Sequence, residues 1–386
     1  MVKIVALCCS FGLGVCFSLL GAISVKLMPR LKIDQAKFGT LVTAFMSACL
    51  VASLLMGVIT DRLGYKPVAV FGFALTAVCI LLLARSRSYA ALFASCLLFG
   101  FGAMALNTAA NTLIPRVLFD GKNAAAALNL GNVAFGVGLL LAPLIVSYLF
   151  RKTSYENTVS ALAVIIAAPV VLAVLATYPP QRAAAFEFAE AISMIAKPAV
   201  LAAFLALFCY AALDVSFSNW LPAFGKEVLA GSRPNADLGA VDASAQRLIS
   251  VYAVSLICGR LIASQVPGLK EYGSSFVAAA SLATALLIVW ITMTRRHAVA
   301  WLLVFVVGLA SAPFFPLIVA TTFDKFSPEV QGSVFGIIFA GALLGGAIVP
   351  KAIGNLARGS SVQKSMRLLA PLCLVLVVLA LILGSL

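Results

Sequence analysis

One carboxylate stands well inside a long apolar stretch of the sequence. Asp214 lies near the middle of an apolar stretch at 198–225. An ionised side chain at bilayer depth costs roughly 2.5–3.5 kcal/mol on insertion scales, so such a residue marks function by default. Asp214 is expected to exchange a proton, to bind sodium, or to accept hydroxyl groups of a solute. The alternative is a structural role, with the carboxylate satisfied by Tyr210 or Ser218 one turn away.

Four asparagines on two neighbouring apolar stretches can line a polar cavity. Asn107 and Asn111 are four residues apart and share one helix face, and Asn129 and Asn132, three apart, share another. Amides supply paired donors and acceptors, which suits a polyhydroxylated solute. Amides can equally join helices to each other, which is worth about 0.6 kcal/mol per bond in membranes. Both roles stay open at this point.

Three aromatic residues in the apolar stretches are further candidates for contact with a solute. Trp220 follows Asp214 by less than two helical turns, and Phe314 and Phe315 lie in a later apolar stretch. Such rings can stack on the apolar face of a sugar. Aromatic side chains in apolar stretches also serve as filler against lipid or core, so this assignment has a structural alternative.

Membrane-spanning helices must position these side chains. Hydrophobic residues make up 63% of the 386 and charged residues 10%, whereas a soluble domain carries about 25% charged residues. A hydrocarbon core about 30 Å thick needs roughly 20 helical residues to cross it. Apolar stretches of this length predict twelve spans, near residues 4–29, 36–60, 66–84, 89–114, 123–150, 157–177, 198–225, 245–266, 274–294, 298–322, 331–355 and 366–385.

The spans fall into two halves. The longest polar interruption, residues 178–197, separates six spans from six. We therefore expect an all-α membrane protein with two pseudo-symmetric six-helix halves, residues 1–177 and 198–386, and a cytoplasmic linker over 178–197. Parallel repeats of this kind recur in transporters, with binding near the membrane midplane where the halves meet.

The joint after the second span reads GVITDRLGYK and starts at Gly57. Gly57 permits close approach of helices. Asp61 can accept a hydrogen bond from a helix N-terminus or pair with a basic residue. Gly64 can make the turn, while Arg62 and Lys66 can reach lipid phosphates or partner acids.

This joint, residues 57–66, resembles the signature loop of the major facilitator superfamily, the pattern G-x-x-x-D-R-x-G-x-K between spans two and three. The resemblance covers nearly the whole chain. It is strongest to the fucose and glucose permease-like branch, whose seventh span is similar to residues 210–222. The branch's tenth and fifth spans are similar to residues 308–316 and 128–143.

The branch implies uptake of a monosaccharide-like solute driven by protons or sodium, without a cofactor. The resemblance adds Tyr210 and Asn219 to the expected substrate contacts and makes Asp214 the coupling group. It makes the signature loop a gating element, with Arg260 of the eighth span as its counterpart in the second half. Many relatives carry an acid where this chain has Asn107 and a histidine where it has Asn132, so the usual coupling arrangement is altered.

The basic residues also bear on localisation. The net charge of +14 is spread over the short joints and suits anionic lipid headgroups rather than nucleic acid. The resemblance implies that the signature loop is cytoplasmic and that the chain lies in the inner membrane of a cell. Both termini are then cytoplasmic, and most basic residues lie outside. The positive-inside rule predicts the reverse. We follow the motif and attribute the bias to an outer vestibule that concentrates an anionic substrate.

These observations predict a secondary transporter that moves a small polar solute, a monosaccharide first, by alternating access. An organic anion carrier of the same fold and a non-transporting receptor are the alternatives. We expect no enzyme, because no Ser/His/Asp set, zinc spacing or phosphate loop occurs. We expect no metal, since the nine cysteines form no CxxC pair. The expected partners are the bilayer, the solute and a coupling proton or sodium ion, and the expected state is a monomer.

Overall fold

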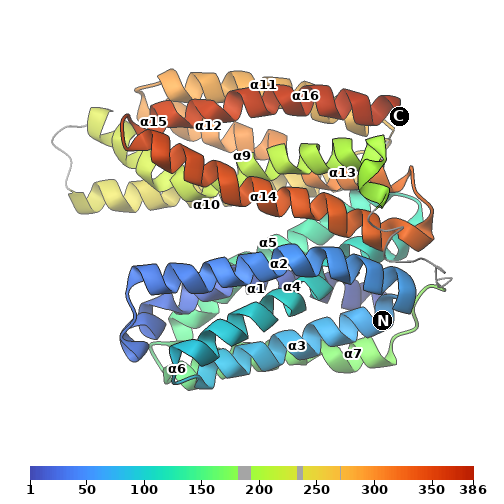
Figure 1. The fold of residues 1–386 in the computed structure, drawn as a ribbon. Coiled ribbons are helices and arrows are strands. Elements are labelled where there is room, and N and C mark those ends of the chain that lie inside the picture. Colours follow the sequence, from blue (N-terminus) through green and yellow to red (C-terminus); the bar gives the residue numbers. More distant parts are fainter. Residues whose placement is uncertain (181–192, 233–237, 270) are drawn as a thin grey trace. The chain divides into compact units, whose positions relative to one another are not determined.

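The computed structural model describes residues 1–180, 193–232, 238–269 and 271–386, with the side chains of all but 229–246. Every regular element in these ranges is a helix (Figure 1). Twelve helical stretches of the described residues are long and apolar enough to cross a membrane, and they coincide with the twelve predicted spans. The predicted all-α membrane fold is therefore confirmed, and the chain is a multi-pass membrane protein.

Contacts between helices divide the chain into two compact units. Unit 1 consists of Met1–Met194 with Phe326–Ile337, and unit 2 of Ile195–Lys325 with Ile338–Leu386. The boundary after Met194 falls inside the predicted linker, of which residues 181–192 lie outside the described residues. The sequence-based division gives Phe326–Ile337 to the second half. In the structure this segment belongs to unit 1, because it packs against helices of that unit.

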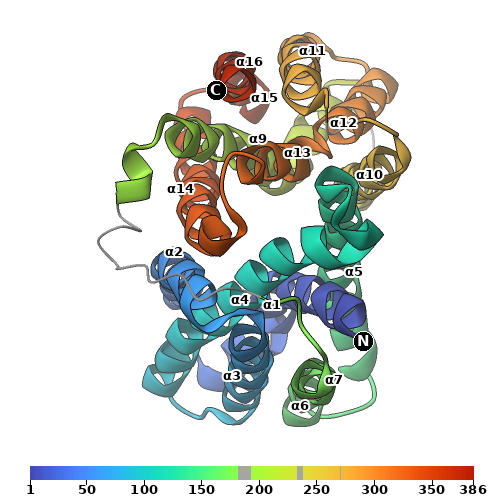
Figure 2. The ribbon, with the colours of Figure 1, turned by 90° about the vertical axis from the view of Figure 1, so that its right-hand side faces the viewer.

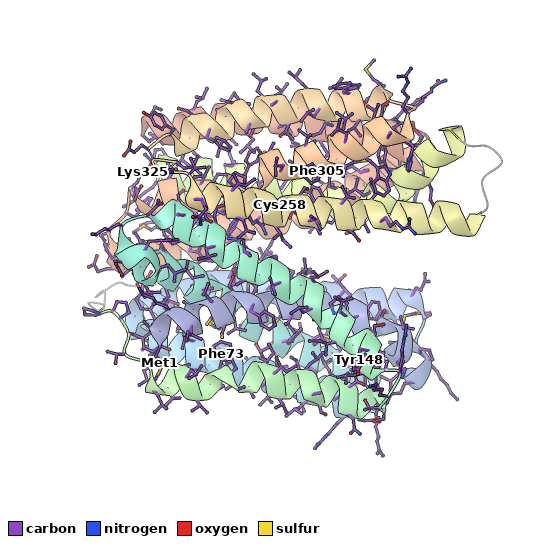
Figure 3. The ribbon with its side chains drawn as sticks, turned by 180° about the vertical axis from the view of Figure 1, so that it is seen from behind. Met1, Phe73, Tyr148, Cys258, Phe305 and Lys325 are labelled. Atoms are coloured by element: carbon purple, nitrogen blue, oxygen red, sulfur yellow. The ribbon has the colours of Figure 1, made fainter. Side chains whose placement is uncertain are left out.

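Unit 1 is a helical bundle with a core of aromatic and aliphatic side chains, among them the fully buried Phe73 (Figure 3). Its helices are α1 (Val2–Leu31), α2 (Gln35–Leu63), α3 (Tyr65–Arg85), α4 (Tyr89–Val117), α5 (Ala124–Leu149), α6 (Tyr155–Ala167) and α7 (Pro169–Leu175). Two glycines, Gly14 and Gly138, let α1 and α5 cross closely, since a Cβ on either would overlap a backbone oxygen of the other helix.

Unit 2 is a second bundle, in which α11 and α16 lie side by side (Figure 1). Its helices are α9 (Pro198–Ser232), α10 (Leu238–Gln265), α11 (Gly273–Met293), α12 (His297–Ser311), α13 (Phe314–Phe323), α14 (Gln331–Ala357), α15 (Val362–Ser365) and α16 (Leu369–Ser385). The predicted tenth span is a broken helix, α12 followed by α13, because Pro313 at the break has no N–H to continue the ladder.

Helix α14 begins in unit 1 and continues in unit 2. Within unit 2 it packs against α9, and the two lie next to each other in Figure 2. A Cβ on Gly341 would overlap the backbone oxygen of Phe204, and a Cβ on Gly345 that of Phe208. These two glycines therefore allow the backbones of α9 and α14 to approach as in other small-residue helix pairs of membranes.

Replacing Gly345 by alanine should destabilise unit 2 by about 1–3 kcal/mol, since the methyl group would displace the backbone of α9. The matched control is Gly21→Ala, because Gly21 also lies inside a spanning helix but has no atom near the added methyl. That change should be neutral or stabilise by about 0.5–1 kcal/mol. Thermal unfolding in detergent measures both, and equal midpoints for the two variants would contradict the close α9–α14 contact.

Candidate functional site

The signature loop ends α2 and caps the start of α14. Asp61 is 1% exposed, and its two oxygens accept one backbone hydrogen bond each. The Gly332 N–H donates to Oδ1 at 2.8 Å and the Ser333 N–H to Oδ2 at 2.6 Å. The carboxylate thus meets the positive end of a helix dipole, one of the two partners that the sequence allows for it. Gly64 makes the turn at φ +83°, where glycine is favoured.

The crossing of α2 with the first turns of α14 depends on glycine. A Cβ on Gly57 would overlap the backbone oxygen of Gly332, and one on Gly332 would overlap the Asp61 carboxylate. A Cβ on Gly336 would overlap the backbone oxygen of Ser53. The close approach expected for Gly57 is therefore present, and its partner is the segment that unit 1 takes from α14.

Arg116, at the end of α4, holds the same segment and was not singled out from the sequence. Its Nη2 donates to the backbone oxygen of Pro328 at 2.6 Å and to Oε1 of Gln331 at 3.2 Å. Its guanidinium also lies 5.1 Å from the ring centroid of Tyr65. Arg62 and Lys66, the basic residues of the signature loop, are exposed. The sequence signal for Arg116 was a basic residue at the end of the fourth span, and such residues are common at membrane edges.

The four predicted asparagines lie on α4 and α5 of unit 1, which contact each other. Nδ2 of Asn111 donates to Oδ1 of Asn107 at 2.9 Å. Asn129 and Asn132 each donate to the carbonyl four residues earlier, at 2.9 Å. Oδ1 of Asn129 is buried and accepts no hydrogen bond from the described residues. An unsatisfied buried acceptor is costly. Of the four amides, Asn129 is therefore the one that a purely structural role explains least.

Asp214 lies near the middle of α9 and belongs to a polar cluster inside unit 2. The Tyr252 hydroxyl, on α10, donates to Oδ1 of Asp214 at 2.9 Å. Nη2 of Arg260 donates to the Tyr210 hydroxyl at 3.2 Å, and Nε donates to the backbone oxygen of Ala312 at 3.4 Å. The charge of Arg260 also acts electrostatically on Asp214. We call Tyr210, Asp214, Tyr252 and Arg260 the charged cluster.

The charged cluster differs from the arrangement expected for Asp214. Ser218 donates to the backbone oxygen of Asp214 rather than to its carboxylate, at 3.0 Å. Tyr210 bonds Arg260, so the carboxylate's hydroxyl partner comes from another helix. No pattern in the sequence identifies Tyr252, because the pairing depends on how α9 and α10 pack.

Arg260 lies toward the end of the eighth span, as expected, but its side chain is buried. The sequence-based prediction treats it as a counterpart of the signature loop near the end of a span. In the structure α10 continues to Gln265, and Arg260 is 5% exposed inside the bundle. A phenol hydroxyl and a carbonyl accept its hydrogen bonds, which allows a guanidinium to be buried there. Arg260 is therefore part of the charged cluster and not of a joint.

The predicted aromatic contacts divide into two groups. The rings of Phe314 and Phe315 lie 6.4 and 6.2 Å from that of Tyr210, so both border the charged cluster. Trp220 instead donates its indole N–H to a backbone oxygen of α14 at 3.0 Å. Asn219 is exposed. Tyr210, Phe314 and Phe315 are therefore brought together with Asp214, whereas Trp220 fastens α9 to α14.

A second carboxylate caps a helix start in unit 2. Glu227, near the end of α9, accepts the Val362 N–H at 2.8 Å and the Gln363 N–H at 2.9 Å. These are the first amides of α15, so Glu227 joins α9 to the start of the last span. The contact repeats the chemistry of Asp61 at another helix, but no local pattern around Glu227 reveals it.

Apolar spanning helices with buried charges held inside their bundles define a polytopic membrane protein of the kind that moves solutes. The family model described as Major Facilitator Superfamily matches residues 5–350. The chain belongs to the major facilitator superfamily, as its signature loop predicts. No curated protein matches the sequence significantly.

Solved structures give the same fold. The fucose:proton symporter FucP of E. coli has a TM-score of 0.76, 19% sequence identity and 97% coverage of either chain. A second FucP structure, in the outward conformation, gives the same values. The human organic anion transporter MFSD10 has a TM-score of 0.76 and 17% identity, with 98% coverage of either chain. The similarity to FucP agrees with the predicted branch, and at these identities it is a similarity of fold.

Replacing Asp61 by alanine should free the first amides of α14. Hydrogen bonds to a charged group contribute about 1.5–3 kcal/mol each, so hydrogen exchange at Gly332 and Ser333 should accelerate by at least about tenfold. Asp120→Ala is the control, because Asp120 forms only an exposed ion pair with Lys3 in the same unit. Unchanged exchange at both amides in Asp61→Ala would show that the cap contributes nothing.

Proposed function

We propose that the chain is a secondary transporter that moves a small polar solute of the monosaccharide class by alternating access. It works in a cell's inner membrane with both termini cytoplasmic and couples the solute to a proton or sodium ion. The observation that carries this proposal is the Asp214 carboxylate, held near the middle of a spanning helix beside a buried arginine. Burying such charges is costly, and transport gives a reason for them.

The surroundings of Asp214 suit a coupling group. When the carboxylate is ionised, it balances the charge of Arg260 inside the apolar bundle. When a proton or a bound sodium ion neutralises it, that charge is left without its counterion. The two states therefore differ in electrostatic energy across the charged cluster, and a bound cation can shift the populations of conformations that treat the cluster differently.

The Asp61 cap supports a gating role for Gly57, Asp61, Arg62, Gly64 and Lys66. The cap holds the first turn of α14 among the helices of unit 1, while most of α14 belongs to unit 2. A motion of one unit against the other must then either break these two hydrogen bonds or bend α14. We infer that the signature loop contributes to the free-energy barrier of one step of the transport cycle.

The monosaccharide assignment rests on three observations of unequal weight. The fucose:proton symporter FucP shares the fold. Oδ1 of Asn129 lacks a donor among the described residues and could accept a solute hydroxyl. Phe315 borders Tyr210 in the charged cluster and could lie against a sugar ring. A receptor with the same fold would bind the solute but move none into sealed vesicles.

Asp214→Asn should abolish accumulation against a gradient while leaving exchange partly intact, because the amide keeps hydrogen bonding but cannot take up a proton. Proteoliposomes with an imposed proton or sodium gradient, supplied from outside with labelled fucose or glucose, measure accumulation, and counterflow measures exchange. Glu271→Gln, an exposed change in a joint of unit 2, is the control. Full accumulation by Asp214→Asn would contradict the coupling role.

Asp61→Ala should slow transport without changing which solute is preferred, since the cap lies on the segment that joins the units and not in the charged cluster. The ratio of uptake rates for two competing sugars, measured in the same vesicles, is the readout. A changed ratio would mean that the signature loop takes part in recognition, and Asp120→Ala should leave both rate and ratio as they are.

A further inference from the structure

An apolar pocket lies between α10 and α12 of unit 2. Its volume is about 360 Å³, which is within the range of small-molecule sites. Its walls come from α10 between residues 259 and 266 and from α12 between residues 306 and 310, with the start of α11 at one side. Cys258 and Phe305, labelled in Figure 3, directly precede these two segments. All its lining side chains are apolar, and the three helices belong to membrane-spanning stretches.

The mouth of the pocket is bordered by exposed apolar side chains. Ile262 and Val266 of α10 are 57% and 40% exposed, and Phe276 of α11 is 37% exposed. Ala263, in the same wall, is buried. The pocket thus leads from the surface of the spanning helices toward the interior of the bundle, and its mouth has the apolar character of the hydrocarbon in which such helices lie.

At Gly259 the pocket reaches the contact of α10 with the break in the tenth span. A Cβ on Gly259 would overlap the backbone oxygen of Leu309 and the methyl group of Ala312, so the two helices touch there. Pro313, also in the wall, has no N–H to offer the Leu309 oxygen four residues earlier. Arg260, the next residue on α10, donates to the Ala312 oxygen at 3.4 Å. The pocket therefore borders the break and the contact that joins it to the charged cluster.

The physics of an apolar cavity determines what enters it. A cavity without polar groups stays dry and takes up apolar molecules. If it stayed empty, its walls would lose the dispersion contacts that a close-packed neighbour supplies. At membrane depth the abundant apolar molecules are the acyl chains of lipids. An acyl chain has no polar group that the walls would leave without a partner.

We propose that this pocket binds one acyl chain of a membrane lipid, which enters past Ile262 and Val266 and packs against the break at Pro313. The bound chain fills the space between α10 and α12 and thereby stabilises the broken helix beside the charged cluster. The site goes beyond the proposed transport function and does not depend on it.

Photochemical labelling of the full chain tests the proposal. The protein is reconstituted in vesicles of phosphatidylcholine with a diazirine on one acyl chain, illuminated, and mapped by mass spectrometry. Leu286, 67% exposed on α11, is the reference for ordinary contact with lipid. We expect label on Leu309 and Ala310 of the pocket wall as well as on Leu286. Label on Leu286 with none on Leu309 or Ala310 would overturn the proposal.

Variants show whether the label enters through the pocket. Ala263→Phe fills the pocket from the α10 wall and should lose the label on Leu309 and Ala310 while keeping that on Leu286. Ala279→Phe is the matched control, because it puts the same ring on the exposed face of α11 outside the pocket. If Ala263→Phe does not fold, Val266→Trp blocks the exposed mouth and leaves the buried wall unchanged. Undiminished label on Leu309 and Ala310 in the folded pocket variant would overturn the assignment.

Thermal unfolding tests the stabilising role of the bound chain. Phosphatidylcholine added to the protein in detergent should raise the unfolding midpoint of Ala279→Phe more than that of Ala263→Phe, since only the former has a pocket to fill. Equal shifts would overturn the claim that the chain stabilises the break. Labelling and unfolding are both measured without a solute, so neither result depends on whether the protein transports one.

Discussion

An ionised side chain inside an apolar bundle must be compensated by fixed dipoles or by an opposite charge, and both units are built around this requirement. In unit 1, Asp61 takes two backbone N–H bonds from the start of α14. In unit 2, Asp214 and Arg260 share a cluster with two tyrosines. The helices that carry these groups could not pack without the partners, because each buried charge would otherwise cost several kcal/mol.

The same requirement explains part of the basic excess on the face expected to lie outside. Lys26 donates to the backbone oxygen of Phe150, the residue that caps the C-terminus of α5, at 2.7 Å. Arg30 donates to the Ala84 oxygen at the end of α3 at 2.9 Å and pairs with Glu156 at 2.7 Å. Cations at helix C-termini complement the dipole. Such residues stabilise unit 1, so a vestibule that concentrates anions must draw on the basic residues that remain.

How much could be predicted from the sequence depends on whether a contact is local. The spans follow from composition and length, and the roles of Gly57 and Gly64 follow from the motif around them. The sequence did not predict the roles of Tyr252, Arg116 and Glu227, because their hydrogen-bond partners lie on helices distant in the sequence. Arg260 was expected as the second-half counterpart of the signature loop, and its burial was not foreseen because it depends on how α10 packs against its neighbours.

The carboxylates of Asp61 and Asp214 suit different tasks because their partners differ. The amides that compensate Asp61 are fixed to the backbone of α14, so that contact can only be made or broken as the helix moves. Asp214 shares its surroundings with the side-chain cation Arg260, so a change in its own charge alters the electrostatic balance of the charged cluster without any helix moving. This difference bears on Asn107 and Asn132, the neutral amides that the family resemblance sets at positions of titratable groups. If coupling resides in the charged cluster of unit 2, neutral amides in unit 1 do not remove it.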